Sequence, residues 1–259
     1  MEFINYTTYQ KAEDIKRLEF ITSNIHNSQQ HTLRILEIGC GNGNISYQLA
    51  KYKHQVTGID ISETTIQAAN ARYGNTPGLQ FKVANAEDLH PAEHLKYDAI
   101  VCSEVLEHLY NPEKLTANFR NLLKPNGVVI VTVPNGNGPR EAFITKPSQK
   151  LAVGKGLLPE LFRKIKYLLG YRGQNAQTSA EHLEHINFFT IPALKLLAAK
   201  SGFEIVKKQA GNFVENVFPF SLITKHAFWL QKFDCYVADV LPLPFTSAFY
   251  TVWKLKEQQ

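Results

Sequence analysis

Acidic and imidazole side chains gather in one short segment of the sequence. Residues 103–108 follow an apolar run, and a helix beginning there would place Glu104, Glu107 and His108 on one face, because positions three and four apart are neighbours on a helix. A second imidazole, His185, is expected to return to the same place. Such a group could take a proton from a hydroxyl, and two carboxylates with two imidazoles would suit a divalent metal ion.

A glycine-rich turn forms a second candidate site. It contains Glu37, Gly39, Cys40, Gly41 and Gly43 and follows the apolar run 33–38. Glycines let the backbone turn tightly and approach a ligand, because a Cβ at these positions would clash or forbid positive φ. The turn therefore predicts a nucleotide-like cofactor.

Three residues bear on which cofactor this is. Asn44 stands where a dinucleotide fingerprint has its last glycine, and the Glu37 carboxylate would repel a pyrophosphate. Glu37 would instead order the turn or, through water, hold a ligand's ammonium group. Asp60 ends the next strand about twenty residues past the turn, where ribose hydroxyls are met; its alternative role is a helix N-cap, for which Ser62 and Glu63 compete. Asp60 does not discriminate between the two cofactors, because nicotinamide enzymes use the same device, but Asn44 and Glu37 favour S-adenosylmethionine over a nicotinamide cofactor.

Strands and helices alternate along the chain, which predicts a parallel doubly wound sheet with ligands over the carboxyl ends of its strands. The expected helices cover residues 7–28, 45–51, 63–73, 115–123 and 191–200, with Trp229 in another. The expected strands cover residues 33–38, 55–60, 79–84, 97–103, 128–133, 204–209 and 249–255.

The chain resembles class I S-adenosylmethionine-dependent methyltransferases. The resemblance lies in four successive segments, 37–43, 58–62, 97–102 and 123–128, and is close over residues 33–134 and looser over 180–211. It implies an α/β, Rossmann-like doubly wound seven-stranded sheet whose last strand is antiparallel and lies beside strand six. It also implies one domain, residues 1–259, with an inserted helical cap or lid at 135–185 over the acceptor site.

The resemblance implies a set of cofactor-binding residues. Asn85 stands where the family usually has Asp; its carbonyl can still accept from an adenine amino group, or the contact shifts to Glu87 or Asp88. Ala86 would offer its backbone amide and Ile61 an apolar face for the ring. The full expected set is Glu37, Gly39, Cys40, Gly41, Gly43, Asp60, Ile61, Asn85, Ala86 and Ser103.

Two interpretations remain for the acceptor side. The Glu-x-x-Glu-His pattern with a downstream His is similar to the metal site of small-RNA 2′-O-methyltransferases and ubiquinone-pathway O-methyltransferases, which would make Glu104, Glu107, His108 and His185 ligands of Mg²⁺. His-x-x-Phe-Phe-Thr at 185–190 is instead familiar from methyltransferases of glycan and small-molecule pathways that need no metal. His108 and His185 would then be acceptor contacts or a general base.

Composition and charge indicate the compartment and the partners to expect for this protein. The chain has 259 residues, is 44% hydrophobic, and has three cysteines, an odd number that fits buried thiols in a reducing cytoplasm. The net charge is +5, and the segment 146–172 alone has seven basic residues against Glu160. A predicted helix at 159–169 with one apolar and one basic face suits peripheral membrane contact. Nucleic acid is disfavoured, because no RNA-binding module flanks the core.

The sequence therefore predicts a cytoplasmic O-methyltransferase of a small-molecule, sugar or lipid-linked acceptor. A metal-dependent enzyme acting on a quinone-precursor catechol or RNA ribose is the first alternative. A non-catalytic S-adenosylmethionine-binding regulatory protein is the second, and a nicotinamide-dependent oxidoreductase is disfavoured by Asn44 and Glu37. Neither the acceptor nor the oligomeric state follows from the sequence.

Overall fold

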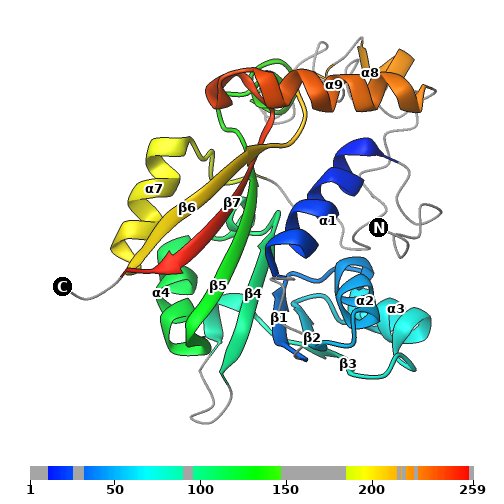
Figure 1. The fold of residues 1–259 in the computed structure, drawn as a ribbon, viewed down its shortest axis with the longest axis vertical. Coiled ribbons are helices and arrows are strands. Elements are labelled where there is room, and N and C mark those ends of the chain that lie inside the picture. Colours follow the sequence, from blue (N-terminus) through cyan, green and yellow to red (C-terminus); the bar gives the residue numbers. More distant parts are fainter. Residues whose placement is uncertain are drawn as a thin grey trace, which may run out of the picture.

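A computed structural model describes residues 11–25, 32–89, 96–146, 185–214, 217, 220–224 and 227–256. These residues form a seven-stranded sheet in the order β3-β2-β1-β4-β5-β7-β6 (Figure 1). Strand β7 is antiparallel to both β5 and β6, and the remaining pairs are parallel. The predicted sheet is confirmed, including the last strand beside strand six. The strands are β1 (Arg34–Ile38), β2 (Gln55–Asp60), β3 (Leu79–Val83), β4 (Tyr97–Ser103), β5 (Leu123–Pro134), β6 (Phe203–Ala210) and β7 (Ala248–Leu255).

Helices cover both faces of this sheet (Figure 1). On one side pack α1 (Ala12–Ile25), α2 (Asn44–Lys51) and α3 (Glu63–Tyr73), and on the other α4 (Pro112–Leu122) and α7 (Ile191–Lys200). Two further helices, α8 (Phe220–Thr224) and α9 (Phe228–Val240), lie together beyond one end of the sheet. Short helical turns are η1 (Ala86–Asp88), η2 (Leu106–His108), the π-helix η3 (Glu141–Thr145) and η4 (Leu243–Phe245).

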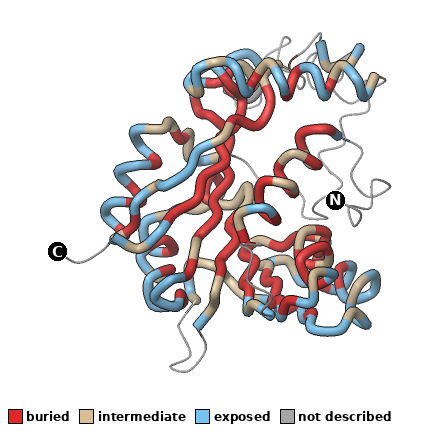
Figure 2. The backbone as a smooth tube through the Cα atoms, viewed as in Figure 1, coloured by how far each residue is buried: buried red, intermediate tan, exposed pale blue. Residues whose placement is uncertain are grey.

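The central strands are buried on both faces, as their nearly continuous apolar sequences predict. Along β5, Val129 and Val131 face one hydrophobic cluster while Ile130 faces the other. Trp253 of β7 is fully buried and lies against the rings of Phe119 and Phe203, with centroids 6.5 and 6.2 Å away. Figure 2 shows this buried interior running along the middle of the sheet.

Several element ends differ from expectation by one residue, and the starts of α4 and β5 differ by more. Helix α4 begins three residues early, because Asn111 caps it by accepting from the Lys114 amide at 3.0 Å, and Pro112 occupies the first turn. Strand β5 begins at Leu123, which pairs with Tyr97 of β4.

Most of the expected cap lies outside the described residues. Only 135–146 and His185 of the range 135–185 are described, so the cap, its helix at 159–169 and its basic segment stay predictions. Among the helices that are described, none is long and apolar enough to cross a bilayer.

Candidate active site

The glycine turn between β1 and α2 is built from left-handed backbone. Gly39, Gly41 and Gly43 have φ of 68°, 52° and 80°. A Cβ on Gly39 would lie 2.3 Å from Cγ2 of Val105, and a Cβ on Gly43 would lie 2.5 Å from the ring of Phe81. Glycine is therefore required at these two positions by backbone and packing together, and the contact with Val105 seats the turn against the loop after β4.

Glu37 lies beneath this turn and is buried. Its carboxylate accepts a hydrogen bond from the Ser46 hydroxyl in the first turn of α2. Burial raises the pKa of Glu37 to about 8, although the bonds from Ser46 oppose the rise. Of its two expected roles, the contact with Ser46 corresponds to ordering of the turn.

Asp60 lies at the carboxyl end of β2, directly beside the turn. Its Oδ2 accepts from the Gly41 amide at 3.0 Å and its Oδ1 from the Ser62 amide at 2.9 Å. The N-cap of α3 is Ser62, whose hydroxyl accepts from the Thr65 amide, so the alternative role of Asp60 as that cap is wrong. The next side chain, Ile61, is 66% exposed.

The segment after β3 holds the expected adenine contacts. The side-chain carbonyl of Asn85 accepts from the Glu87 amide at 3.1 Å and so caps η1, which contains Ala86. Glu87 accepts from the Asn111 amide, and Asp88 accepts from Asn85 and pairs with Lys114 at 3.0 Å. All three polar side chains therefore take part in local structure, and a carbonyl oxygen keeps a second lone pair for a ligand.

Two remaining residues of the expected set lie at strand ends. Cys40 is buried, and burial raises the pKa of its thiol, which makes it a packing group rather than a reactive one. The Ser103 and Thr132 hydroxyls are hydrogen-bonded to each other at 2.9 Å. The Thr132 hydroxyl in turn donates to the Glu104 carboxylate.

These features fit S-adenosylmethionine. The left-handed turn lets backbone approach a ligand, Asp60 supplies a carboxylate beside it, and the exposed Ile61 offers an apolar surface at the same edge. Glu37 contributes through the first of its two expected roles, because its buried carboxyl group bonds Ser46 of α2 beneath the turn.

The prediction that a helix after β4 places Glu104, Glu107 and His108 on one face is wrong. Glu104 has a φ of 57°, and only Leu106–His108 form a helical turn, η2. The Glu104 carboxylate accepts from the Thr132 hydroxyl at 3.0 Å and lies 3.5 Å from the Arg17 guanidinium of α1. Its carboxylate is thus engaged with Thr132 and Arg17 and does not join the cluster that a shared helix face would have formed.

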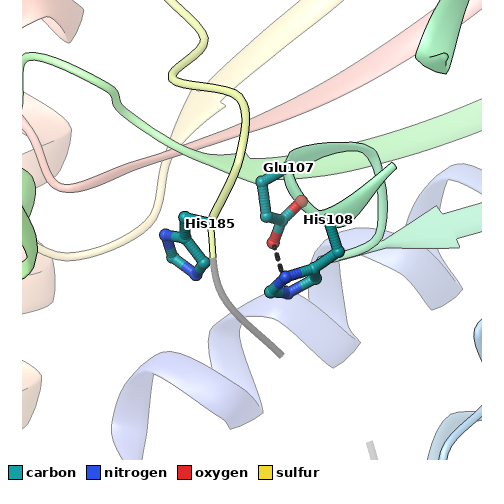
Figure 3. Close-up of side chains that lie close together, drawn as sticks. All are labelled: Glu107, His108 and His185. Carbon is teal, nitrogen blue, oxygen red and sulfur yellow. Dashed lines mark ion pairs between the residues drawn. The ribbon is translucent and has the colours of Figure 1, made fainter. Parts of the chain in front are cut away.

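The two histidines nevertheless meet (Figure 3). The rings of His108 and His185 lie edge to face with centroids 5.0 Å apart, and Nε2 of His108 is 3.8 Å from Oε1 of Glu107. One ligand atom from each of Glu107, His108 and His185 falls within 4.8 Å of the others. The predicted return of His185 to the loop after β4 is thus observed.

Backbone contacts explain how residues so distant in sequence come together. The amides of Ile186 and Asn187 both donate to the carbonyl of Glu107, at 2.8 and 2.9 Å. The Asn187 side chain also donates to the carbonyls of Leu106 and Leu109. The segment after residue 185 is therefore bound along the whole η2 turn.

Sequence reasoning missed one acidic residue of this site. Glu141, fully buried at the start of η3, has Oε1 3.2 Å from Nδ1 of His185. Each histidine therefore has a buried carboxyl group beside it. Nothing in the sequence around Glu141 marks it, since the contact depends on how the chain folds after β5.

The pKa of the Glu107 carboxyl group depends on burial, on a neighbouring carboxylate and on two arginines. Burial raises the pKa of Glu107 well above its usual range, and the neighbouring Glu104 raises it further, while Arg17 and Arg140 oppose both effects. Neither carboxyl oxygen of Glu107 has a hydrogen-bond partner among the residues described. Glu107 is thus a buried group that favours holding a proton.

Comparison with known proteins gives consistent relatives. A family model described as a methyltransferase domain matches residues 6–208. The ubiquinone biosynthesis O-methyltransferase of Rickettsia canadensis is 33% identical over 121 residues, which are 46% of this chain and 51% of that protein. The protein of the same name from Shewanella halifaxensis is 34% identical over 105 residues, 40% and 44% of the two chains. The chain thus spans about half the length of these curated relatives.

Solved structures share the fold over nearly the whole chain. PKMT2 from Rickettsia typhi, in complex with AdoHcy, has a TM-score of 0.58 at 17% identity, covering 97% of this chain and 54% of that one. The CcbJ methyltransferase from Streptomyces caelestis has a TM-score of 0.57 at 15% identity, covering 93% and 89%.

Proposed function

Because the chain belongs to the methyltransferase-domain family and is an S-adenosylmethionine-dependent methyltransferase, we propose that it methylates a hydroxyl oxygen of a small-molecule acceptor. One observation carries the proposal: two imidazoles, each beside a buried carboxyl group, face one another after β4. The relatives named ubiquinone biosynthesis O-methyltransferase support a phenolic acceptor, and sugar or lipid-linked hydroxyls remain candidates.

On this proposal one half of the site binds the cofactor, and the adjacent half removes a proton from the acceptor. The glycine turn, Asp60 and Ile61 would hold S-adenosylmethionine, which supplies an electrophilic methyl group when bound. The turn contacts the loop carrying His108 through Gly39 and Val105, so the two halves of the site are adjacent. Holding two reactants in line and excluding water accounts for most of the catalysis needed in such a transfer.

His108 or His185 would act as the general base for the acceptor hydroxyl. An imidazole suits this role because its ordinary pKa lies close to neutral pH. Glu141 would position His185, because its Oε1 lies 3.2 Å from Nδ1 of the ring and leaves Nε2 for the acceptor.

A metal-dependent O-methyltransferase is the second candidate, and the cluster of Glu107, His108 and His185 favours it. These donors suit a divalent ion, and both carboxyl oxygens of Glu107 are buried without a hydrogen-bond partner in the described part of the chain. Such an ion, Mg²⁺ in the first instance, would lower the pKa of an acceptor hydroxyl. Glu104 is not included in this set, because its carboxylate bonds Thr132 and faces Arg17.

Titration calorimetry with S-adenosylhomocysteine tests the cofactor side. We expect binding by the wild type and at least about tenfold weaker binding by Asp60→Ala, because charge-assisted hydrogen bonds to the ribose are worth about 1.5–3 kcal/mol. Glu63→Ala, an exposed acid three residues later, is the matched control. No binding by the wild type would sink the cofactor assignment.

Methyl transfer to a panel of catechol, sugar and lipid-linked acceptors tests the acceptor side. We expect His108→Gln or His185→Gln to lower kcat by about 10²–10⁴-fold while S-adenosylhomocysteine binding is kept. Loss of turnover in chelator, restored by Mg²⁺, would select the metal-dependent candidate. Tight cofactor binding without transfer to any acceptor would instead favour a non-catalytic binding protein.

A further inference from the structure

Helix α9 carries an exposed apolar stripe that the methyl-transfer site does not use. Trp229, Phe233, Tyr236 and Val240, which we call the α9 stripe, recur every three or four residues and so share one helix face. Trp229 is 70% and Phe233 60% exposed. Nearby, Phe220 and Ile223 of α8 are exposed as well, so the apolar surface extends over both helices.

The opposite face of α9 is firmly attached to the rest of the molecule. Gln231, Asp234, Cys235 and Ala238 are buried, and Figure 2 shows buried and exposed stretches alternating along the helix. Asp234 accepts from the amides of Phe213 and Val214, at 2.8 and 2.9 Å. The stripe is therefore the outer surface of a well-packed helix rather than a core face left open by poor packing.

The charges around the stripe favour an anionic partner. Of the two acids in α9, Asp234 is buried and Asp239 pairs with Lys16 of α1 at 2.9 Å. Lys232, exposed between Trp229 and Phe233, lies over the ring of Phe228 at 5.1 Å. The exposed face thus presents aromatic rings and a lysine, while the two acids of α9 are buried or paired with a lysine.

Helix α9 also lies beyond the carboxyl end of β5, the same end of the sheet at which the candidate active site is found (Figure 1). Lys16 of α1 holds α9 through the carbonyl of Cys235 and through Asp239. The adjacent residue Arg17 faces Glu104, at the carboxyl end of β4. Helix α1 therefore contacts both α9 and the loop that follows β4.

We propose that the α9 stripe docks on the surface of an anionic lipid bilayer. Trp, Tyr and Phe with Lys on one face of a helix are the side chains that partition into the headgroup region, where rings bury their apolar parts and lysine stays with the phosphates. A contiguous exposed apolar surface marks a contact with a partner, whereas hydrophobic side chains scattered singly over a surface do not. The inference does not depend on the proposed reaction.

Vesicle binding of the full chain tests the proposal. The probes are vesicles of phosphatidylcholine with and without phosphatidylglycerol, and no cofactor or acceptor is present. Of the two tryptophans of the chain, Trp253 is fully buried, so a blue shift of emission on adding vesicles reports Trp229. We expect this shift, together with co-sedimentation, on the anionic vesicles.

The variant Phe233→Ser/Tyr236→Ser keeps Trp229 and should weaken vesicle binding at least about tenfold. Leu196→Ser is the matched control, because Leu196 is 59% exposed on α7, on the other side of the molecule. Unchanged melting temperatures would establish that both variants fold. The proposal would be overturned if the wild type did not bind vesicles, or if Leu196→Ser lost as much binding as the double variant. It would also be overturned if the double substitution left binding unchanged, which would assign the contact to another segment such as 146–172. A dimer in light scattering that the double variant splits would also overturn it, in favour of a second copy.

Discussion

Glu37 is a carboxyl group whose surroundings oppose its charge. It lies beneath the glycine turn with Ser46 as its donor, and burial raises its pKa to about 8, against an ordinary value near 4.5. Above pH 4.5 the unfolded chain gives up this proton while the folded chain still holds it. The contribution of Glu37 to the free energy of unfolding must therefore fall as pH rises from about 4.5 to about 8, by up to ~1.4 kcal/mol per pH unit, and this contribution changes no further above that range.

Glu37→Gln should remove this dependence, because glutamine does not titrate and its amide oxygen can still accept from Ser46. Urea unfolding at several pH values between 5 and 8 measures the free energy of unfolding of both proteins. We expect the variant to gain stability relative to wild type as pH rises. Glu113→Gln, which changes an exposed carboxylate, serves as control. Parallel stability curves for wild type and Glu37→Gln would contradict the burial argument.

The sequence located most residues of the candidate site but not their contacts. His108 and His185 were both expected there, and both meet. Glu104 was wrongly expected to join them, because helical spacing was assumed where a positive φ and a bond from Thr132 direct its side chain elsewhere. Glu141 was missed for a similar reason, since its place beside His185 follows from tertiary packing and not from any local pattern.

At the scale of elements, two turns from different parts of the chain fit into one another. The space where Gly39 would carry a Cβ is taken by Cγ2 of Val105, which belongs to the loop leading to His108. The cofactor turn and the histidine loop are therefore a single packed unit. A substitution in one should change the effect on stability of a substitution in the other.

A double-mutant cycle measures this coupling. Gly39→Ala should destabilise the fold by about 2–4 kcal/mol, because it adds a clash to a positive φ. Combining it with Val105→Ala removes the clash and should recover at least about 1 kcal/mol beyond additivity. Unfolding free energies of the wild type, both single variants and the double variant give the result; additive effects would show that the two turns do not constrain each other.

Strand and helix positions were predictable where the pattern is local. Helices α3 and α7 begin and end as expected, since apolar periodicity, Ser62 and Thr190 caps and stop residues agree there. The 3₁₀ turn η2 and the π-helix η3 were not predicted, because neither contains enough residues to show a period.

At the scale of the whole molecule, an aromatic group joins helix to sheet on one face. Phe119 of α4 is fully buried against Phe203 of β6 and Trp253 of β7. Phe119→Ala should lower the free energy of unfolding by about 3–5 kcal/mol, through lost burial and the cavity left behind. Leu196→Ala on the exposed side of α7 should change it by no more than about 0.5 kcal/mol. Denaturant unfolding compares the two, and similar effects would refute this description of the core.

Helix α1 has its partners far along the chain. The Ala12 amide donates to Gln231, 219 residues later, and the Tyr250 hydroxyl donates to the carbonyl of Glu13, 237 residues earlier. During synthesis α1 leaves the ribosome with its apolar face uncovered and must wait for α9 and β7, because contacts across such long loops form late. Since Arg17 reaches Glu104 from this helix, a helix made before every strand of the sheet is among the last elements to be placed. The side of the candidate site that it supplies is then finished only after β7 has emerged.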